Sequence, residues 1–414
     1  MMQDDSLIQW PRQDGSRVPY GVFTRADVFA REQERIFRGP LWCYVALEAE
    51  LPEPRDFKTS FVGDTPVIVS RAEDGSLHVF VNRCAHRGAT VERRPSGNAR
   101  DHRCVYHQWC YNAKGDLTGV PYRHGVKGMG GYGADFNLRE HGLQKLRVAA
   151  HRGAIFASFD AAAPALEDYI GGPMLGQLDR ILSRPIKVLG HMRQRIKGNW
   201  KLYVENTRDP YHAALLHGFH ATFGTYRTNQ KGFRVRDAAR LHSSGGKYGD
   251  DFHKIAGASE VGQDKFIAKY SLEDPSLMAG RPDFNDGIGL QITSIFPNLV
   301  LQQIMNTLAT RQIRPKAADE FELYWTYFGY ADDDAETEAT RLKQANLVGP
   351  AGLISMEDGE AIELIQRAIV HDGKESSFLE FGATPTNGED DDAGEGTVRA
   401  FWRNYARLMD GATP

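Results

Sequence analysis

The chain contains few cysteines and no excess of charge of either sign. Four cysteines in 414 residues are too few for a disulfide-rich extracellular fold, and free thiols fit a reducing compartment. The formal net charge of -4 argues against a nucleic-acid surface. No apolar run is long enough to span a bilayer, and the first residues lack the features of a secretory signal. We therefore predict a cytoplasmic protein that binds neither nucleic acid nor membrane.

The sequence also lacks a glycine-rich dinucleotide fingerprint, which argues against a dinucleotide-binding domain in this chain. It contains no internal repeat and no long low-complexity tract. Its length exceeds what one hydrophobic core usually holds, which favours two domains.

Two of the cysteines lie in a repeated pattern with histidine. Cys84 is followed two residues later by His86, and Cys104 three residues later by His107. A C2H2 zinc finger keeps its cysteines together and its histidines together, whereas each loop here offers one of each. That order is the Rieske pattern, in which two imidazoles hold one iron of a [2Fe-2S] cluster and two thiolates hold the other. A structural zinc site is the alternative.

A second candidate metal site follows the dipeptide Asp209-Pro210. His212 and His217 are five positions apart, which is about 140° on an ideal helix, so the helix must be distorted or one histidine must lie at its end. Two histidines need one carboxylate to complete the triad used by non-haem iron oxygenases, and the acids of residues 355–360 are candidates. The alternative for these acids is helix capping, and for Asp209 it is the N-cap of a helix beginning at Pro210.

Three segments differ in their pattern of apolar, polar and turn-forming residues. Residues 1–40 predict an extended arm and a helix that pack on the domain formed by residues 161–414. Residues 41–160 show short alternating apolar runs with glycine turns, which indicate an antiparallel β domain. Residues 161–414 are typical of a mixed α+β domain. Its predicted helices are Tyr169 to Leu182, Ala335 to Ala345 and Glu357 to Ala368, and its predicted strands are Gln194 to Ile196, Leu290 to Phe296, Leu299 to Met305 and Glu320 to Tyr330. We predict loops at residues 243–264, as a mobile loop or lid, and at residues 388–395.

These motifs resemble those of the large (α) subunits of Rieske non-haem iron aromatic-ring-hydroxylating oxygenases. The resemblance covers nearly the whole chain and is greatest to the group acting on aromatic carboxylates: terephthalate 1,2-dioxygenase, anthranilate 1,2-dioxygenase and salicylate 5-hydroxylase. The matching stretches are Cys84-Ala85-His86-Arg87-Gly88, Cys104 to Trp109, Glu205 to His217, and Gly349 to Gly359, in which the family's carboxylate ligand falls on Asp358.

The resemblance implies a Rieske β domain followed by a helix-grip (START-like) domain, an antiparallel sheet wrapped around a long helix. It implies a [2Fe-2S] cluster held by Cys84, His86, Cys104 and His107, and Fe(II) held by His212, His217 and Asp358. The implied activity is hydroxylation of an aromatic carboxylate with O2 and NADH-derived electrons, giving a cis-dihydrodiol. The alternatives are a monohydroxylating enzyme of the salicylate 5-hydroxylase type and an iron-sulfur electron-transfer subunit without catalytic iron.

The resemblance also implies partners. Three large subunits would assemble with three small β subunits, and a ferredoxin or a flavin reductase would deliver the electrons. The productive cluster-to-iron pair would form across a subunit boundary. Asp209 would bridge it by accepting hydrogen bonds from His107 of one subunit and His212 of the next.

Two arginines are candidates for binding the substrate carboxylate, because a guanidinium offers a bidentate fork that lysine lacks. Arg311 and Arg399 both have apolar neighbours in the sequence, which predicts partial burial. A structural ion pair is the alternative for each. If both arginines face the pocket, a dicarboxylate such as terephthalate fits; one alone fits anthranilate or salicylate.

Overall fold

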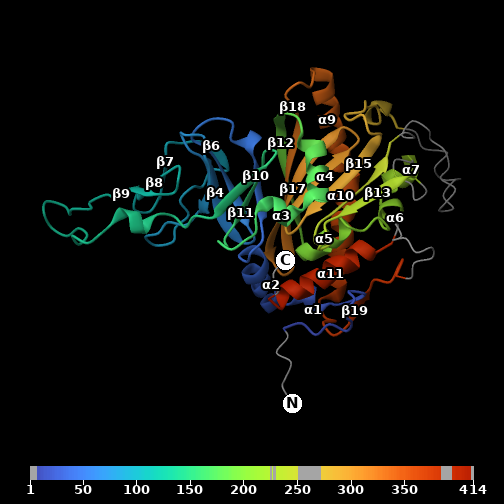
Figure 1. Cartoon of the computed structure of the whole chain (residues 1–414), viewed down its shortest axis with the longest axis horizontal. Helices are drawn as coiled ribbons and strands as arrows, with labels where there is room; N and C mark the ends of the chain where they lie inside the picture. Colours follow the sequence, from blue (N-terminus) through green and yellow to red (C-terminus); the bar gives the residue numbers. More distant parts are fainter. Residues whose placement is uncertain (1–6, 224–225, 227–229, 250–271, 384–393, 412–414) are drawn as a thin grey trace, which may run out of the picture. The chain divides into compact units, whose positions relative to one another are not determined.

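The computed structural model describes residues 7–223, 226, 230–249, 272–383 and 394–411. The chain divides into two compact units. One comprises Phe37–Leu166, and the other combines Met1–Ile36 with Glu167–Pro414. The first 36 residues therefore belong to the same unit as the C-terminal part of the chain (Figure 1).

The unit Phe37–Leu166 is built from antiparallel strands in three small sheets, ordered β10-β11-β2, β5-β4-β3-β6 and β7-β8-β9. Its strands are β2 (Cys43–Leu47), β3 (Asp56–Val62), β4 (Thr65–Arg71), β5 (Leu77–Val81), β6 (Ser96–Asn98), β7 (Asp101–Arg103), β8 (Cys110–Asn112), β9 (Leu117–Gly119), β10 (Arg147–His151) and β11 (Ala154–Ser158). Phe57, Ile68 and Phe80 form a buried cluster with Trp109 and Tyr111. These features confirm the predicted antiparallel β domain.

The second unit contains a seven-stranded antiparallel sheet, ordered β12-β18-β17-β16-β15-β14-β13 (Figure 1). Its strands are β12 (Ile186–Ile196), β13 (Gly232–Arg236), β14 (Ser243–Tyr248), β15 (Ile288–Ile295), β16 (Leu299–Ile304), β17 (Thr307–Ala317) and β18 (Glu320–Tyr330). A separate pair joins β1 (Arg17–Pro19) to β19 (Ser376–Phe378) and so ties the N-terminal arm to this unit.

Helices complete the second unit, and α5 and α10 contact the sheet and each other. The helices are α1 (Gly21–Thr24), α2 (Ala26–Glu32), α3 (Leu166–Ile170), α4 (Gly172–Leu182), α5 (Trp200–Asn206), α6 (Ala213–Leu216), α7 (Gly218–Phe223), α9 (Ala335–Val348), α10 (Leu353–Ile369) and α11 (Gly396–Met409). A π-helical turn, Gln33–Phe37, continues α2. Helices and an antiparallel sheet together confirm the predicted α+β class.

The strand register decides which side chains share a face of this sheet. Val300 pairs with Arg311, and Arg311 pairs with Trp325. Paired residues lie on the same face and alternate residues along a strand share that face. Ile304, four residues after Val300, therefore shares a face with Arg311, and so does Leu290, which pairs with Ile304.

Several predicted elements are confirmed and others are wrong. Strand β18 coincides with its prediction, and α10 contains the predicted helix. The helix predicted from Tyr169 is broken at Gly171, whose φ of 79° is left-handed. The loop predicted from residue 243 is wrong at its start, where β14 joins the sheet through paired backbone, and residues 250–264 lie outside the described part. Most of the loop predicted at 388–395 also lies outside it.

Strand β17 and helix α11 were not predicted. Strand β17 is buried on both faces over its first seven residues, so its sequence lacks the alternation of apolar and polar residues that marks a half-exposed strand. Polar Thr307, Thr310 and Arg311 are all buried in it.

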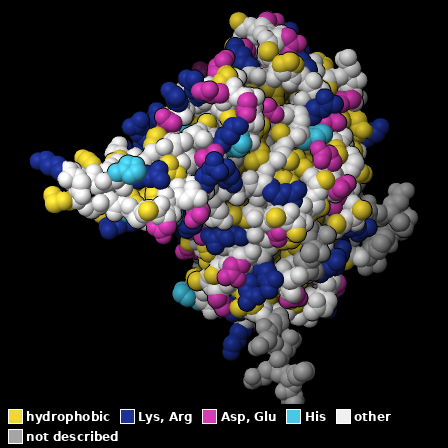
Figure 2. Space-filling view, turned by 60° about the vertical axis from the view of Figure 1, so that its left-hand side comes forward, with side chains coloured by type: hydrophobic (Ala, Val, Ile, Leu, Met, Phe, Trp, Pro, Cys, Tyr) yellow, Lys and Arg dark blue, Asp and Glu magenta, His cyan; other side chains and the backbone are white. Residues whose placement is uncertain are grey.

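Within the described residues, no helix is long and apolar enough to cross a membrane. Lysine and arginine side chains are interspersed with aspartate and glutamate on the face drawn in Figure 2, as the small net charge leads one to expect.

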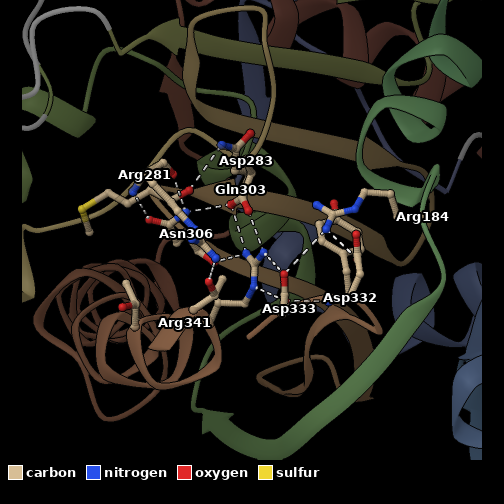
Figure 3. A network of polar contacts seen from close by, with 12 residues as sticks. Arg184, Arg281, Asp283, Gln303, Asn306, Asp332, Asp333 and Arg341 are labelled. Atoms are coloured by element: carbon tan, nitrogen blue, oxygen red, sulfur yellow. Dashed lines mark hydrogen bonds and ion pairs between the residues drawn. The ribbon is translucent and has the colours of Figure 1, made fainter. Parts of the chain in front are cut away.

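A buried arginine network joins α9 to the sheet and to the segment before β15 (Figure 3). The guanidinium of Arg341 pairs with Asp283 at 2.6 Å and with Asp333 at 2.8 Å, and it donates to the carbonyl of Asn306 at 2.7 Å. Burial alone would raise the pKa of Asp333, but the hydrogen bonds from Arg341 outweigh it and lower that pKa. The arginine thus neutralises two buried carboxylates.

Replacing this arginine tests the network. Arg341→Met leaves the buried carboxylate of Asp283 without its cation and leaves Asp333 with the guanidinium of Arg184 at 3.8 Å. We expect a loss of about 3 kcal/mol or more in the free energy of unfolding. Thermal and urea unfolding measure the loss. The matched control on the same helix is Lys343→Met, whose partner Asp274 is exposed, and it should change little. Equal stability of the two variants would contradict the role given to Arg341.

Candidate metal centres and substrate cavity

The first candidate site is made by two loops with the same backbone hydrogen bonds. In each loop the cysteine N–H donates to the carbonyl of the fifth residue after it, at 2.8 Å for Cys84 and 2.9 Å for Cys104. The cysteine carbonyl accepts from the fourth residue, Gly88 or Gln108, at 2.9 Å in both loops. Both fourth residues have positive φ, 75° and 58°. The two loops therefore have the same backbone turn at the cysteine, although the histidine follows one residue later in the second loop.

The four candidate cluster ligands converge. The imidazoles of His86 and His107 face each other, with 3.1 Å between their Nδ1 atoms, and the ring of His86 stacks on Trp109 at 4.9 Å. Burial and then His107 lower the pKa of His86, which favours neutral imidazole. Burial raises the pKa of Cys84, and the neighbouring thiol of Cys104 raises it further. Two imidazoles and two thiols thus lie at one place.

The second candidate site lies in the other unit, where a one-turn helix has a histidine at each end. His212 is the N-cap of α6 and His217 is its C-cap, with extended backbone. Residues five positions apart point about 140° apart on an ideal helix. Neither histidine lies inside α6, so both can approach one metal ion. The prediction that a helix begins at Pro210 is wrong, since α6 begins at Ala213.

Both imidazoles point at one carboxylate oxygen. Asp358 Oδ1 lies 3.5 Å from His212 Nε2 and 3.4 Å from His217 Nε2. One potential ligand atom from each of the three residues lies within 4.8 Å of the others. Burial alone would raise the pKa of Asp358, but His212 and His217 outweigh it and lower that pKa. The sequence-predicted triad is brought together in space.

Further polar groups hold these side chains in place. Asn206 donates from its amide to Asp358 Oδ1 at 2.9 Å. Glu357 lies 3.0 Å from His217 Nδ1 and accepts from the N–H of Gly218 at 3.0 Å. A carboxylate on the far nitrogen of an imidazole fixes its tautomer and raises its basicity, as it does in metal-bound histidines.

Asp209 contacts the other histidine. Its Oδ2 lies 3.4 Å from His212 Nδ1, and its Oδ1 accepts from the N–H of Tyr211 at 2.8 Å. Burial would lower the pKa of His212, but the carboxylates of Asp209 and Asp358 raise it to about 9. The electrostatic field here favours a cation. Asp209 makes an Asx-type turn rather than the helix cap considered from the sequence.

A cavity extends from the triad along the sheet face defined above. It is lined by His212, His217 and Asp358 at one side and by Leu290, Ile304 and Arg311 on the sheet. Arg311 is 6% exposed. Its guanidinium donates to the Tyr203 hydroxyl at 2.7 Å and to the side-chain oxygen of Gln302, and it lies 4.5 Å from the ring of Trp325.

Arg399 has a different environment. It lies in α11 and donates to the backbone carbonyls of Leu379 and Phe381, at 3.1 and 2.9 Å, and of Gly382 at 3.1 Å. Arg399 is not among the residues that line the cavity. The structure therefore brings one of the two predicted arginines to the triad and uses the other to hold the turn after β19.

Comparison with known proteins decides the family. The Rieske [2Fe-2S] domain family matches residues 41–130, and the family "Ring hydroxylating alpha subunit (catalytic domain)" matches residues 179–411. The chain belongs to the ring-hydroxylating alpha subunits. This confirms the resemblance drawn from the motifs and argues against an iron-sulfur electron-transfer subunit without catalytic iron, because the matched catalytic domain implies a mononuclear iron.

Relatives of this alpha subunit cover nearly its whole length. It is 51% identical to the anthranilate 1,2-dioxygenase large subunit of Burkholderia cepacia, over 98% of this chain and 96% of that protein. It is 44% identical to the terephthalate 1,2-dioxygenase terminal oxygenase component subunit alpha 2 of Comamonas sp., over 98% of each. It is 42% identical to the salicylate 5-hydroxylase large oxygenase component of Ralstonia sp., over 97% and 96%.

The fold matches a solved structure of the family. The naphthalene 1,2-dioxygenase of Rhodococcus sp., solved with bound indole, superposes with a TM-score of 0.77 at 24% identity, over 96% of this chain and 95% of that one. The similarity shows that the alpha subunit shares this fold.

The two matched domains imply a [2Fe-2S] cluster and a mononuclear non-haem iron. The residues present fit both groups. Two thiols and two imidazoles suit a Rieske cluster, and two histidines with one carboxylate suit a non-haem iron. Both Nε2 atoms are directed at the third ligand candidate, Asp358 Oδ1.

Sequence reasoning missed Tyr203 and Gln302, and it treated Glu357 as a candidate ligand rather than as a partner of His217. The position of Glu357 beside Asp358 was a signal, because a helix places adjacent side chains about 100° apart and one can then support a ligand while the next provides it. No short-range signal connects Tyr203 or Gln302 to Arg311, since they are 108 and 9 residues away.

We predict that Glu357→Ala weakens Fe(II) binding at the mononuclear site by about 10- to 100-fold, because His217 loses the carboxylate that orients it. Anaerobic titration of protein depleted of that iron measures the affinity. The control is Glu360→Ala, on the exposed side of the same helix. It should bind Fe(II) with the affinity of the unaltered protein. Equal affinities in both variants would show that Glu357 does not support the site.

Proposed function

We propose that this alpha subunit hydroxylates an aromatic carboxylate. His212, His217 and Asp358 hold the mononuclear iron, and Cys84, His86, Cys104 and His107 hold the cluster. The observation that carries the substrate class is a buried guanidinium, Arg311, on the wall of the cavity that the triad lines.

The guanidinium of Arg311 has only neutral hydrogen-bond partners among the described residues, Tyr203 and Gln302. A buried cation without a counter-charge is costly, and an anionic ligand removes that cost. A carboxylate also matches the fork of donors that arginine presents. The relatives named for anthranilate, terephthalate and salicylate, all aromatic carboxylates, support this assignment.

Unpaired polar atoms around Arg311 support it further. Arg311 Nε, Gln302 Nε2, Trp325 Nε1 and Tyr327 Oη are all buried without a hydrogen-bond partner. The strand register places these residues on the same sheet face, because Trp325 pairs with Arg311, and Ala309 pairs with both Gln302 and Tyr327. Buried donors normally have acceptors. Of these four residues Arg311 lines the cavity, so a ligand rich in acceptor oxygens can supply an acceptor to Arg311 Nε.

The overall reaction consumes one O2, one NADH and one proton for each aromatic acid. A cis-dihydrodiol takes both oxygen atoms, whereas a phenol takes one and releases the other as water. When bound, the iron supplies the site for oxygen activation and the cluster supplies one-electron transfer. The chain itself contributes the two histidines, the Asp358 carboxylate, and the Arg311 cation that orients the acid in the cavity.

In this proposal a separate reductase oxidises NADH, and the electrons pass to the cluster directly or through a ferredoxin. Three large subunits assemble with three small β subunits, and Asp209 links the cluster of one subunit to the iron of the next. Asp209 contacts His212 and its side chain is 23% exposed, so one carboxylate can serve both an internal and a partner imidazole. The four cysteines form no disulfide in this structure, which supports a reducing, cytoplasmic location.

Oxygen uptake with benzoate, anthranilate, salicylate and terephthalate tests the function, with a surrogate reductase and with benzamide as the neutral analogue. We expect NADH-dependent uptake and a hydroxylated product from at least one acid and none from the amide. In Arg311→Leu, binding of that acid should weaken by about 30-fold or more, which is about 2 kcal/mol, since a charge-assisted pair is lost. Product analysis separates the dihydrodiol from the phenol.

Arg399→Leu in the same binding assay examines the other predicted arginine. Arg314→Leu is the control on strand β17, because Arg314 pairs with Glu322 at 3.0 Å and does not line the cavity. The carboxylate assignment would be wrong if oxygen uptake were equal with acid and amide and if Arg311→Leu and Arg399→Leu both bound the acid with unaltered affinity. The substrate would then be a neutral aromatic compound.

Asp209→Ala tests the bridge. Turnover per bound iron should fall by about 100-fold or more while the cluster spectrum stays unchanged, because the link between two imidazoles is removed. His212 also loses the carboxylate beside its Nδ1, so iron binding should weaken as well, and iron content is measured in the same samples. Asp209→Asn keeps an acceptor for the Tyr211 N–H and so preserves the turn, but it lacks the charge; we expect it to be slow as well. Full turnover in Asp209→Asn would show that Asp209 stabilises the turn and does not act as the charged bridge.

A further inference from the structure

Helix α5 carries two polar side chains that contact two different residues of the cavity wall, Arg311 and Asp358. Tyr203 accepts the hydrogen bond from Arg311, and Asn206 donates to Asp358. The two are three positions apart and therefore lie on the same side of the helix. One short helix thus contacts both the candidate substrate anchor and the candidate iron ligand (Figure 1 shows α5 beside α10 and β17).

Arg311 is held from two sides. Tyr203 Oη accepts from Nη1 at 2.7 Å, and Gln302 accepts from Nη2. Trp325 lies under the guanidinium plane at 4.5 Å. Tyr203, Gln302 and Trp325 are all buried. A long side chain that would otherwise sample many rotamers is therefore confined to one position.

We propose that Tyr203 and Gln302 are positioning residues that set the distance and direction between the Arg311 cation and the iron triad, and so determine which ring carbon of the aromatic acid is hydroxylated. The inference rests on the proposed function, because it takes Arg311 as the carboxylate anchor. It adds that affinity and reaction position are controlled by different residues: Arg311 provides the charge, and its two neutral neighbours provide its placement.

The physical basis is the short reach of ring hydroxylation. An acid anchored at one end presents a particular carbon to the triad, and a displacement of about 1 Å can cost about 100-fold in rate. Tyr203 suits the task because burial raises the pKa of its phenol, which keeps it neutral. Glutamate or aspartate at either position would pair with Arg311 and remove the cation from the substrate. The neutral phenol and amide hold the guanidinium without neutralising it.

Two variants test the proposal. Tyr203→Phe removes the acceptor on α5, and Gln302→Met removes the acceptor on β16; each keeps the charge of Arg311. Tyr330→Phe is the control, because Tyr330 is also fully buried and donates to a carbonyl, that of Ile181 at 2.8 Å, away from the cavity. Thermal unfolding and iron content establish that each variant is folded and loaded.

Two measurements separate placement from affinity. Calorimetry with protein depleted of mononuclear iron gives the affinity for the best acid of the oxygen-uptake panel, and we expect it to weaken by about tenfold or less. Turnover of loaded enzyme gives the product formed for each O2 consumed, and the ratio of ring positions hydroxylated. We expect the product yield to fall by more than half, with the missing O2 recovered as hydrogen peroxide, and the positional ratio to broaden.

The outcomes are distinct. Product yield and positional ratio equal to those of Tyr330→Phe, in a folded Tyr203→Phe or Gln302→Met, overturn the positioning role and leave the proposed function intact. Undiminished binding in Arg311→Leu overturns the anchor itself and with it the proposed function. If Tyr203→Phe does not fold, Gln302→Met decides the matter from the sheet side.

Discussion

The buried carboxylate of Asp358 is the point at which three helices of the second unit meet. Its Oδ1 accepts from Asn206 of α5 and faces the Nε2 atoms of the two histidines that flank α6, while α10 carries the carboxylate itself. Removing a carboxylate from water is costly unless positive charge or hydrogen bonds replace the solvent. The helices therefore have to approach closely enough for their polar groups to meet at one oxygen, and a cation-binding site results.

The interior of the second unit also holds the positive charge of Arg311, and the carboxylate of Asp358 must not neutralise it. Arg311 and Asp358 line one cavity, but the guanidinium is bonded to the neutral Tyr203 and Gln302. The antiparallel sheet makes this possible. Its register brings buried polar side chains of β16, β17 and β18 to one face, where Trp325 covers the guanidinium plane. A charge held by neutral donors and acceptors keeps its attraction for an incoming anion.

Helices and strands with a regular pattern were predictable from the sequence. β18 is rich in aromatic residues, and α10 has apolar residues at helical spacing. The pattern failed where both faces of an element are buried, as in β17, and where glycine with positive φ breaks a helix, as at Gly171. It also failed at β14, because Ser243 to Tyr248 is glycine- and serine-rich and becomes a strand only by pairing with β15.

The sequence by itself determined the metal chemistry, because thiolates, imidazoles and a carboxylate are restricted residue types and most of them lie a few positions apart. The repeated Cys–His loops and the His212–His217 pair are local features of that kind. Only the tertiary structure decided which arginine faces the cavity, that Asp209 forms a turn rather than a helix cap, and that Glu357, Tyr203 and Gln302 support the site. Those relations join α5, α6, α10 and the sheet, in most cases across more than 100 residues, and the register of strands and the packing of helices that create them are properties of the whole fold.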